Sequence, residues 1–231
     1  MNQLPIIRVI IPALNEQNAV GKVITDLPKS ILSEVIVVDN GSIDNTPAVA
    51  SKSGATVLKE AKKGYGYACL CGIEYINQLE ENTDIVVFID ADYSDYPEQL
   101  QEVVAPIIEN GYDLVIGSRN LGHKEKGSMT VPQIFGNWLA TRLIKLIYGA
   151  NFTDLGPFRA IRLESLNDID MQDTTYGWTV EMQLKVAKNN MKSTEVAVNY
   201  KNRIGTSKIS GTIKGTILAG YKIIWTILKY A

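Results

Sequence analysis

Two aspartates separated by one residue form the clearest candidate for chemistry. Asp90 and Asp92 flank Ala91 directly after residues 85–89, an apolar run typical of a buried strand. In extended backbone, residues i and i+2 point the same way, so the two carboxylates share one locus and repel each other. A divalent cation relieves this repulsion, and oxygen ligands favour Mg²⁺ or Mn²⁺ with phosphates completing the shell. The alternative is a solvated turn with helix-capping aspartates, and Asp95 is a candidate for such a cap.

Polar side chains also follow two earlier strand-like runs. Residues 12–16 read P-A-L-N-E, and residues 38–46 read V-D-N-G-S-I-D-N-T. Asp39, followed by Asn-Gly, predicts a tight turn that is open to a ligand, where its carboxylate could accept hydrogen bonds from a base or ribose. Asp44 is better placed to cap the next helix. Glu16 could either cap the helix that follows it or line the same pocket.

A basic segment near the C-terminus offers the complementary charge. Arg203, Ser207 and Lys208 belong to the run R-I-G-T-S-K, which combines two cations, two hydroxyls and a glycine. Such a loop suits an anion, and phosphate is the natural partner. The alternative is a solvated basic loop without a ligand.

Several common catalytic patterns are absent from the sequence. His123 is the only histidine and lies in a polar stretch, so acid–base chemistry by histidine is not expected. The G-x-S-x-G pattern, the P-loop pattern and a G-x-G-x-x-G after the first strand are all missing, which disfavours the corresponding hydrolases, P-loop enzymes and dehydrogenases. Cys69 and Cys71 are too close in sequence for a mutual disulfide, and we expect buried, reduced thiols.

Alternating strand-like and helix-like stretches must position these residues. Strands are predicted at residues 8–11, 35–38, 56–58, 85–89 and 114–116, and helices at residues 17–27, 46–53, 65–79 and 97–110. Continuously apolar strands between helices predict an α/β fold with a Rossmann-like, mostly parallel sheet covered on both faces. Ligands bind beyond the carboxyl ends of such strands. The polar strand-end clusters, including Ser118 and Arg119, should therefore converge on one crevice.

The second half of the chain is predicted to add helices at residues 134–148, 178–189 and 211–231, and strands that lead to residue 162 and span 194–200. We expect a catalytic domain at residues 1–210 and a C-terminal amphipathic helix at 211–231. Helical spacing places Lys214, Lys222 and Lys229 within an arc of about 80°. A different, broad apolar face is formed by Ile213, Ile217, Tyr221, Ile224 and Leu228. Such a helix suits an anionic membrane surface, while core packing or a dimer contact are the alternatives.

Charge is distributed unevenly along the chain. Residues 1–120 carry a net charge of −9 and residues 121–231 a net charge of +7. An acidic half suits a cation site, and a basic half suits a phosphate, a membrane surface or nucleic acid. Nucleic-acid binding leaves the acidic strand-end clusters unexplained, so no nucleic-acid partner is expected. Because no secretory leader and no apolar run of about 18 residues is found, we expect a cytoplasmic protein, peripheral at the cytoplasmic membrane face or docked to a membrane-anchored partner.

The ordered series of motifs resembles the inverting glycosyltransferases of family 2, which have a GT-A fold. The series runs P-A-L-N-E, V-D-N-G-S-I-D-N-T, K-K-G-Y-G, D-A-D-Y-S-D-Y-P-E and G-S-R, then T-D-L-G-P-F-R-A-I-R, G-W-T-V-E-M and R-I-G-T-S-K. The second group is similar to dolichyl-phosphate mannose synthases and polyprenyl-phosphate glycosyltransferases. The resemblance covers roughly residues 5–210.

The resemblance implies a role for each matching residue. A nucleotide-sugar donor would contact Pro12, Leu14, Glu16, Asp39, Asp90, Ala91 and Asp92, and Asp90 and Asp92 would hold the Mg²⁺ or Mn²⁺. Phosphate or acceptor groups would contact Arg119, Arg203, Ser207 and Lys208. The catalytic residues would be Asp154, Arg119 and Asp92.

Two positions depart from the mannose synthase pattern. Asn40 replaces the second aspartate of the usual V-D-D-G-S, and Ser94 replaces a glutamine two residues past the metal aspartates. These changes leave the base and the sugar open. The expected activity is inverting, metal-dependent transfer from a UDP- or GDP-sugar to a polyprenyl phosphate. The alternative is transfer to a saccharide or other soluble hydroxyl acceptor.

Overall fold

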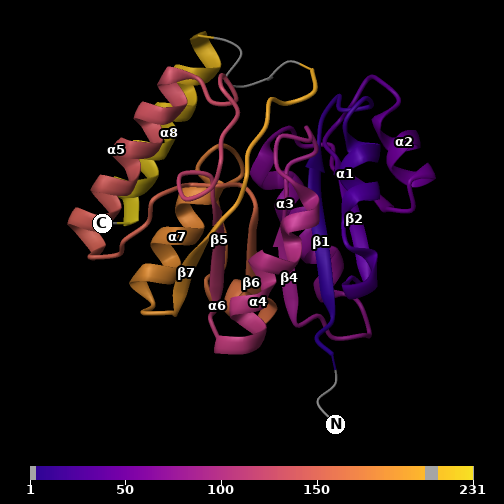
Figure 1. The fold of residues 1–231 in the computed structure, drawn as a ribbon, viewed down its shortest axis with the longest axis horizontal. Coiled ribbons are helices and arrows are strands. Elements are labelled where there is room, and N and C mark those ends of the chain that lie inside the picture. The colour runs from indigo at the N-terminus through magenta and orange to yellow at the C-terminus, as the bar shows by residue number, and fades with distance from the viewer. Residues whose placement is uncertain (1–3, 206–212, 231) are drawn as a thin grey trace.

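A seven-stranded sheet with helices on both faces forms the protein (Figure 1). The computed structural model describes residues 4–205 and 213–230. In the order of the sheet, the strands are β3 (Thr56–Lys59), β2 (Glu34–Asp39), β1 (Ile7–Ala13), β4 (Ile85–Phe88), β6 (Arg159–Arg162), β5 (Leu114–Ser118) and β7 (Ser193–Ala197). The predicted α/β class with a mostly parallel sheet is confirmed.

One strand runs against the others. β6 pairs antiparallel with both β4 and β5, so that Arg159 lies opposite Phe88 and Ile116, near the ends of those strands. Its first residue therefore sits at the edge where the parallel strands end. The segment that precedes β6 consequently reaches the edge where ligands bind in parallel sheets.

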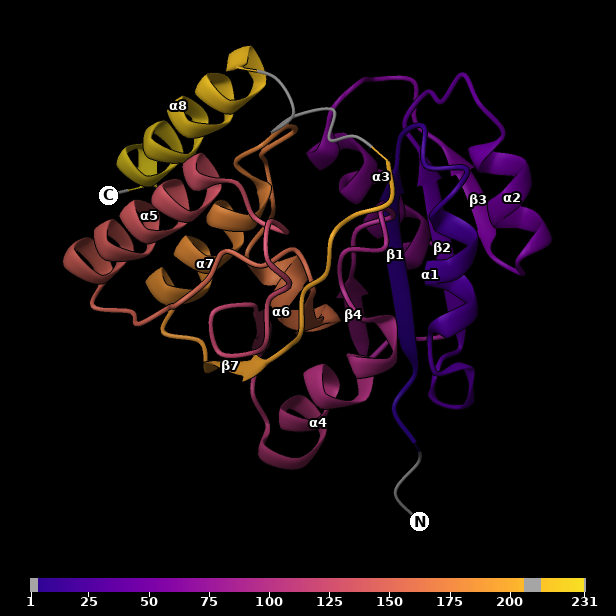
Figure 2. The ribbon, with the colours of Figure 1, turned by 45° about the horizontal axis from the view of Figure 1, so that its top comes forward.

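The strands bury alternate residues in two separate cores. On β1, Val9 and Ile11 face one core, while Ile10 faces the other, as a strand period of two requires. The first core contains side chains of α1 (Val20–Asp26), α2 (Thr46–Lys52) and α4 (Leu100–Asn110). The second contains side chains of α3 (Tyr65–Asn77), α5 (Val131–Tyr148), α7 (Trp178–Lys188) and α8 (Ile213–Tyr230). Two layers of helices thus hold the sheet from both sides (Figure 2).

Every predicted strand and helix is present, with shifts at the ends. Three short elements were not predicted: the helix α6 (Leu163–Asp168) and two 3₁₀ turns, η1 (Lys29–Ile31) and η2 (Pro97–Gln99). Cys69 is buried and Cys71 is half-buried, and both thiols are free. No helix among the described residues is long and apolar enough to span a membrane.

The last helix, α8, packs against the rest of the protein through a different face from the one predicted to be apolar. Ile227 is buried in the second core, and Ile223 packs against that core. Tyr221 and Leu228, from the predicted apolar face, are exposed. Lys222 forms an ion pair with Asp173 at 2.9 Å. The side chains of Lys214, Ile213 and Ile217 fall outside the described residues.

Candidate active site

The D-A-D turn lies directly beyond β4, in the centre of the sheet edge. Two donors on Ser94, its backbone N–H and its hydroxyl, bind Asp92 Oδ1 at 2.9 and 2.6 Å. The Tyr65 hydroxyl donates to Asp90 Oδ1 at 3.1 Å. Burial, and then the neighbouring Asp92 carboxylate, raise the pKa of Asp90 to about 7. The turn therefore concentrates negative charge that a cation would neutralise.

Arg203 reaches this turn from the other end of the chain. Its guanidinium lies 3.1 Å from Asp92 Oδ2 and 2.7 Å from Glu16 Oε1. The next residue, Ile204, donates its N–H to the carbonyl of Asp92 at 3.0 Å. The start of the R-I-G-T-S-K run is thus bound to the D-A-D turn. Ser207 and Lys208, predicted to act with Arg203, fall outside the described residues.

The loops after β1 and β2 are tied to each other. Asn15 has a left-handed backbone with φ 54°, and its side-chain oxygen accepts from Ile43 N at 2.8 Å. Glu16 donates its N–H to Thr46 Oγ1 at 2.7 Å. Asn45, and not the predicted Asp44, is the N-cap residue of α2, and its side chain forms no cap hydrogen bond. Asp44 Oδ1 accepts the N–H of Thr46, the first residue of α2, at 3.0 Å. Both loops therefore form one rigid wall beside the D-A-D turn.

The other four predicted donor-binding residues also lie on this wall and turn. Pro12 and Ala91 are buried, while Leu14 is half-buried. Asp39 is 6% exposed, and its Oδ1 accepts the N–H of Ser42 at 3.2 Å. The tight turn predicted from Asp-Asn-Gly-Ser is therefore present, with the Asp39 carboxylate at the strand end.

Asn40, which departs from the family pattern, has a structural task that an aspartate could not perform. Its amide nitrogen donates to the carbonyls of Glu60 and Lys62, at 3.2 and 2.7 Å. Its amide oxygen accepts from Gly64 N at 2.7 Å. A carboxylate can only accept, so it would repel the two carbonyls. The asparagine fixes the segment between β3 and α3.

Arg119 and Asp154, predicted as separate site residues, form one buried ion pair. Asp154 accepts the Nε and Nη2 hydrogens of Arg119 at 2.7 Å each, and also its backbone N–H at 2.8 Å. The ring of Tyr200 lies 5.0 Å from the guanidinium carbon. Burial lowers the pKa of Arg119, but the Asp154 carboxylate more than reverses this, and the net pKa is raised. The pair is therefore a fixed charged unit.

The segment that carries Asp154 is held by polar side chains that the sequence analysis missed. Asn137 on α5 donates to the carbonyl of Thr153 at 3.1 Å and accepts from the N–H of Leu155 at 2.8 Å. Glu195 on β7 accepts the N–H groups of Thr153 and Asp154, at 2.9 and 3.1 Å. One signal was available in the sequence, since Asn137 is a polar residue on the inward side of an apolar helix.

Two further buried side chains complete this support. Gln183 on α7 donates to the carbonyl of Asp154 at 3.0 Å. Arg159 is fully buried and donates to the carbonyls of Leu155 and Gly156, at 3.1 and 3.0 Å, and to that of Thr179. Burial lowers the pKa of Arg159 to about 10. Side chains from four elements thus fix the position of the Asp154 carboxylate.

Asp95 does not cap a helix, so that prediction was wrong. Its side chain is buried, and neither carboxylate oxygen has a hydrogen-bond partner among the described residues. Burial, and then the charge of Asp90, raise the pKa of Asp95 well above its usual range. The site thus contains a further carboxyl group that favours its protonated form.

The oxygen atoms at the D-A-D turn suit a cation held by two protein carboxylates. Among the described residues, no group of three or more histidine, cysteine, aspartate or glutamate side chains is arranged to hold a metal ion. Asp90 and Asp92 share one turn, where burial, and then the charge of Asp92, raises the pKa of Asp90. Mg²⁺ characteristically takes one or two carboxylates together with substrate phosphates.

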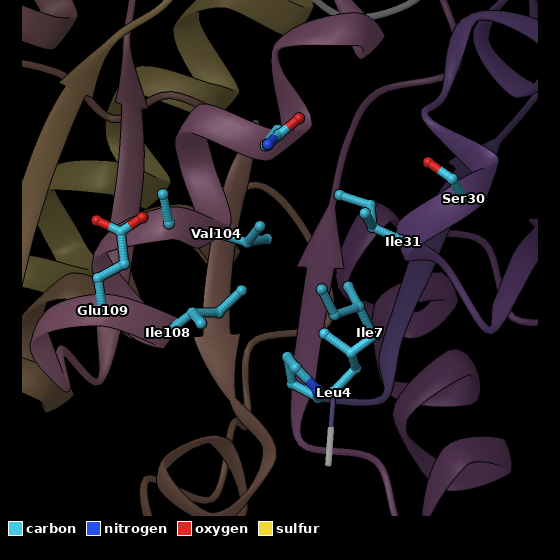
Figure 3. Close-up of a pocket in the computed structure, with 10 residues that line it drawn as sticks. Leu4, Ile7, Ser30, Ile31, Val104, Ile108 and Glu109 are labelled. Atoms are coloured by element: carbon cyan, nitrogen blue, oxygen red, sulfur yellow. The ribbon is translucent and has the colours of Figure 1, made fainter. Parts of the chain in front are cut away.

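An apolar pocket elsewhere is unrelated to this site. Ile7, the first residue of β1, and Leu4, which precedes the strand, line it together with Ile31, Val104 and Ile108 (Figure 3). The D-A-D turn lies at the opposite end of the strands, and the pocket contains one carboxylate, Glu109. It does not offer the charge that a nucleotide-sugar site requires.

Comparison with known proteins identifies the family. The sequence profile of Glycosyl transferase family 2 matches residues 8–170. The chain therefore belongs to glycosyl transferase family 2 and is a glycosyltransferase. It is 32% identical over 226 residues to a dolichyl-phosphate hexose transferase of Haloferax volcanii, covering 96% of this chain and 93% of the relative. It is 30% identical over 218 residues to an undecaprenyl-phosphate mannosyltransferase of Micrococcus luteus, covering 89% and 88%.

Solved structures agree on the fold. Glucosyl-3-phosphoglycerate synthase of Mycobacterium tuberculosis, crystallised with Mn²⁺, UDP and phosphoglyceric acid, superposes with a TM-score of 0.77 at 23% identity. The match covers 98% of this chain and 78% of that chain. The expected GT-A architecture is confirmed by this likeness.

Proposed function

We propose that this glycosyltransferase transfers a hexose, with inversion, from a UDP- or GDP-sugar to a polyprenyl phosphate, with Mg²⁺ or Mn²⁺ as cofactor. One observation carries the proposal. A paired-carboxylate turn bound by Arg203 and the buried Arg119–Asp154 pair belong to one continuous edge of the sheet. The first part suits a metal-bound diphosphate, and the second suits the reaction centre.

On the donor side, Asp90 and Asp92 would hold the cation. When bound, that cation supplies Lewis-acid stabilisation to the diphosphate leaving group. The wall formed by the loops after β1 and β2 would hold the nucleoside, through Pro12, Leu14, Glu16 and Asp39, with Ala91 beneath it.

Arg203 would supply the second positive charge to the departing diphosphate. Its guanidinium already lies between Glu16 and Asp92, next to the turn that would hold the cation. Preorganised charge of this kind stabilises the transition state, because no reorganisation is needed as the bond breaks. Ser207 and Lys208 would extend the same contact along the phosphates.

On the acceptor side, a phosphate oxygen would attack the anomeric carbon from the face opposite the leaving group. The new bond joins the anomeric carbon to that oxygen. The bond to the diphosphate breaks, and its electron pair leaves with the nucleoside diphosphate. An acceptor phosphate is already anionic near neutral pH, so no strong base is required. Arg119 would orient the acceptor. Both Asp154 oxygens already accept hydrogen bonds from Arg119, so Asp154 would act by holding that guanidinium in place.

Two relatives support the polyprenyl phosphate acceptor, because their names specify dolichyl and undecaprenyl phosphate and the alignments cover nearly the whole chain. In this proposal residues 1–210 form the catalytic unit and residues 211–231 an extension that works at the cytoplasmic membrane face. A second candidate is a soluble acceptor. It is favoured by the structural likeness to an enzyme whose name specifies a phosphoglycerate product.

The test measures sugar transfer from a panel of UDP- and GDP-sugars, with Mg²⁺, Mn²⁺ or EDTA, and with or without a short-chain polyprenyl phosphate. Turnover that requires both the cation and the lipid phosphate would support the proposal and name the donor. Metal-dependent transfer to phosphoglycerate or a saccharide, with none to the lipid phosphate, would instead support the soluble acceptor. The donor site would stand in either case.

A further inference from the structure

Two neighbouring helices turn large apolar side chains to the outside. α5 and α8 lie side by side at one end of the molecule, and both pack against α7 (Figures 1 and 2). We define the α5–α8 face by nine exposed apolar residues, which are Val131, Ile134, Phe135, Trp138, Leu146, Leu218, Tyr221, Trp225 and Leu228. Ile147, also exposed, lies on another side of α5. An exposed apolar patch of this kind marks an interaction surface in most proteins.

On α5 the exposed residues form a single stripe. Helical spacing places Ile134, Phe135 and Trp138 within an arc of about 120°, and the same arc contains Arg142 and Lys145. Trp138 is 52% exposed and Phe135 is 59% exposed, and their rings lie 5.9 Å apart. The opposite side of the helix is buried. The stripe is therefore a property of the helix surface and not a gap in the core.

α8 repeats this arrangement. Leu218, Trp225 and Lys229 point outward, whereas Ile223 and Ile227 face the core. The ammonium of Lys229 lies 5.4 Å from the Trp225 ring. Tryptophan with lysine on a helix surface is typical of the water–lipid boundary, where the ring lies among headgroups and the cation among phosphates.

The charge of the two helices selects the partner. Neither helix contains an aspartate or a glutamate, although the chain has 25 acidic residues. Arg142, Lys145 and Lys229 are exposed, and Lys222 is partly engaged by Asp173. A second copy that bound through the same face would place these cations against each other. An anionic surface would instead complement them.

The position of α5 connects this face to the candidate site. The outward side of the helix carries Trp138, and the adjacent Asn137 on the inward side binds Thr153 and Leu155, which flank Asp154. A helix with its side chains is about 10 Å across. A surface bound to α5 would therefore lie roughly one helix thickness from the segment that carries Asp154.

We propose that the α5–α8 face binds the surface of an anionic lipid bilayer, with its aromatic side chains among the headgroups and its cations at the lipid phosphates. The helices lie flat on the bilayer, which places the segment that carries Asp154 about one helix thickness from the lipid surface. This inference deepens the proposed function. Binding of the face to the bilayer does not depend on that function, and only the expected advantage for a lipid-linked acceptor rests on it.

Flotation with vesicles tests the binding directly. The full chain should float with vesicles of phosphatidylcholine mixed with phosphatidylglycerol, and much less with phosphatidylcholine alone. Added salt should weaken binding, because cations on a surface are screened. Equal or absent binding to both kinds of vesicle would overturn the inference.

Matched substitutions locate the surface. Ile134→Glu and Trp138→Glu should each weaken binding to anionic vesicles by about 10-fold or more, because a large apolar side chain is no longer buried and a like charge is added. Ile108→Glu is the control, because Ile108 is 49% exposed, close to the 51% of Ile134, but lies on α4 on the opposite face of the sheet. Equal binding by all three variants would overturn the inference. Size-exclusion chromatography gives a second check, and a wild-type dimer that Trp138→Glu converts to monomer would assign the face to a second copy instead.

A transfer assay separates this inference from the proposed function. Trp138→Glu should retain wild-type transfer to a short-chain, water-soluble polyprenyl phosphate and lose it when the acceptor is embedded in anionic vesicles. Equal loss with both acceptors would overturn the docking role and leave the function intact. Vesicle binding without transfer to any polyprenyl phosphate would overturn the function and leave the docking surface intact.

Discussion

Replacing Asp154 by asparagine should reveal how much the buried ion pair contributes to stability. The side chains of Arg119 and Asp154 are 10% and 0% exposed, so water cannot solvate the guanidinium when its partner is lost. An asparagine keeps one acceptor oxygen and turns an N–H₂ group toward the other guanidinium nitrogen. Breaking a buried pair by removing one partner costs about 3–5 kcal/mol. For a chain of this size, that corresponds to a fall in Tm of roughly 6–20 °C.

Urea unfolding followed by circular dichroism measures this cost, with Glu81→Gln as control. Glu81 also pairs with an arginine, Arg8, at 2.6 Å, but its side chain is 62% exposed. Its loss should change the free energy of unfolding by about 1 kcal/mol or less. A double variant, Arg119→Met with Asp154→Asn, should be more stable than the sum of the two single changes predicts. Losses below about 1 kcal/mol for Asp154→Asn, or strict additivity, would refute the assignment of a buried, mutually dependent pair.

Three other predictions concern the same edge of the sheet. Asp92→Asn should reduce metal-dependent turnover by about 10³-fold, and wild-type rates would contradict the metal assignment. Asn40→Asp should lower the free energy of unfolding by about 1–3 kcal/mol, measured in urea, because two carbonyls lose their donor. Asp95→Asn should raise Tm at neutral pH. Because the pKa of Asp95 is raised in the folded state, its contribution to stability is present below the unfolded pKa of about 4 and is lost as pH rises through the folded pKa. The difference in Tm should therefore shrink in acid, and a difference independent of pH would contradict this account.

The strand-end clusters could be predicted because they depend on local patterns. Apolar runs such as residues 85–89 mark the strands, and the rule for parallel sheets brings their ends together. Asp90, Asp92, Asp39 and Arg119 therefore lie on the predicted edge. The roles assigned to them remain predictions, because those came from the resemblance to a family.

Contacts between distant parts of the chain could not be predicted in this way. The Asp154 segment is bound by Asn137 and Glu195, which lie far apart in sequence. Both side chains come within hydrogen-bond distance of this segment only when α5 and β7 pack against it. The antiparallel direction of β6 could not be predicted either, because a four-residue strand has no sequence pattern that distinguishes parallel from antiparallel pairing. On α8, two apolar stripes were available, and only the packing against α5 and α7 selected Ile227 for the core.

The support of the Asp154 segment has a consequence for how such enzymes diverge. Asn137, Gln183, Glu195 and Arg159 all follow β5 in the chain, whereas the D-A-D turn and the wall beside it precede β5. Apart from Arg203, which follows β7 and reaches back to the D-A-D turn, the two parts of the site are therefore encoded in separate stretches of the gene. With the roles proposed above, the later stretch could change to accept a new acceptor while the earlier stretch keeps its nucleotide sugar. A chimera joined just after β5 should accordingly inherit its acceptor from the C-terminal parent and its donor from the N-terminal one.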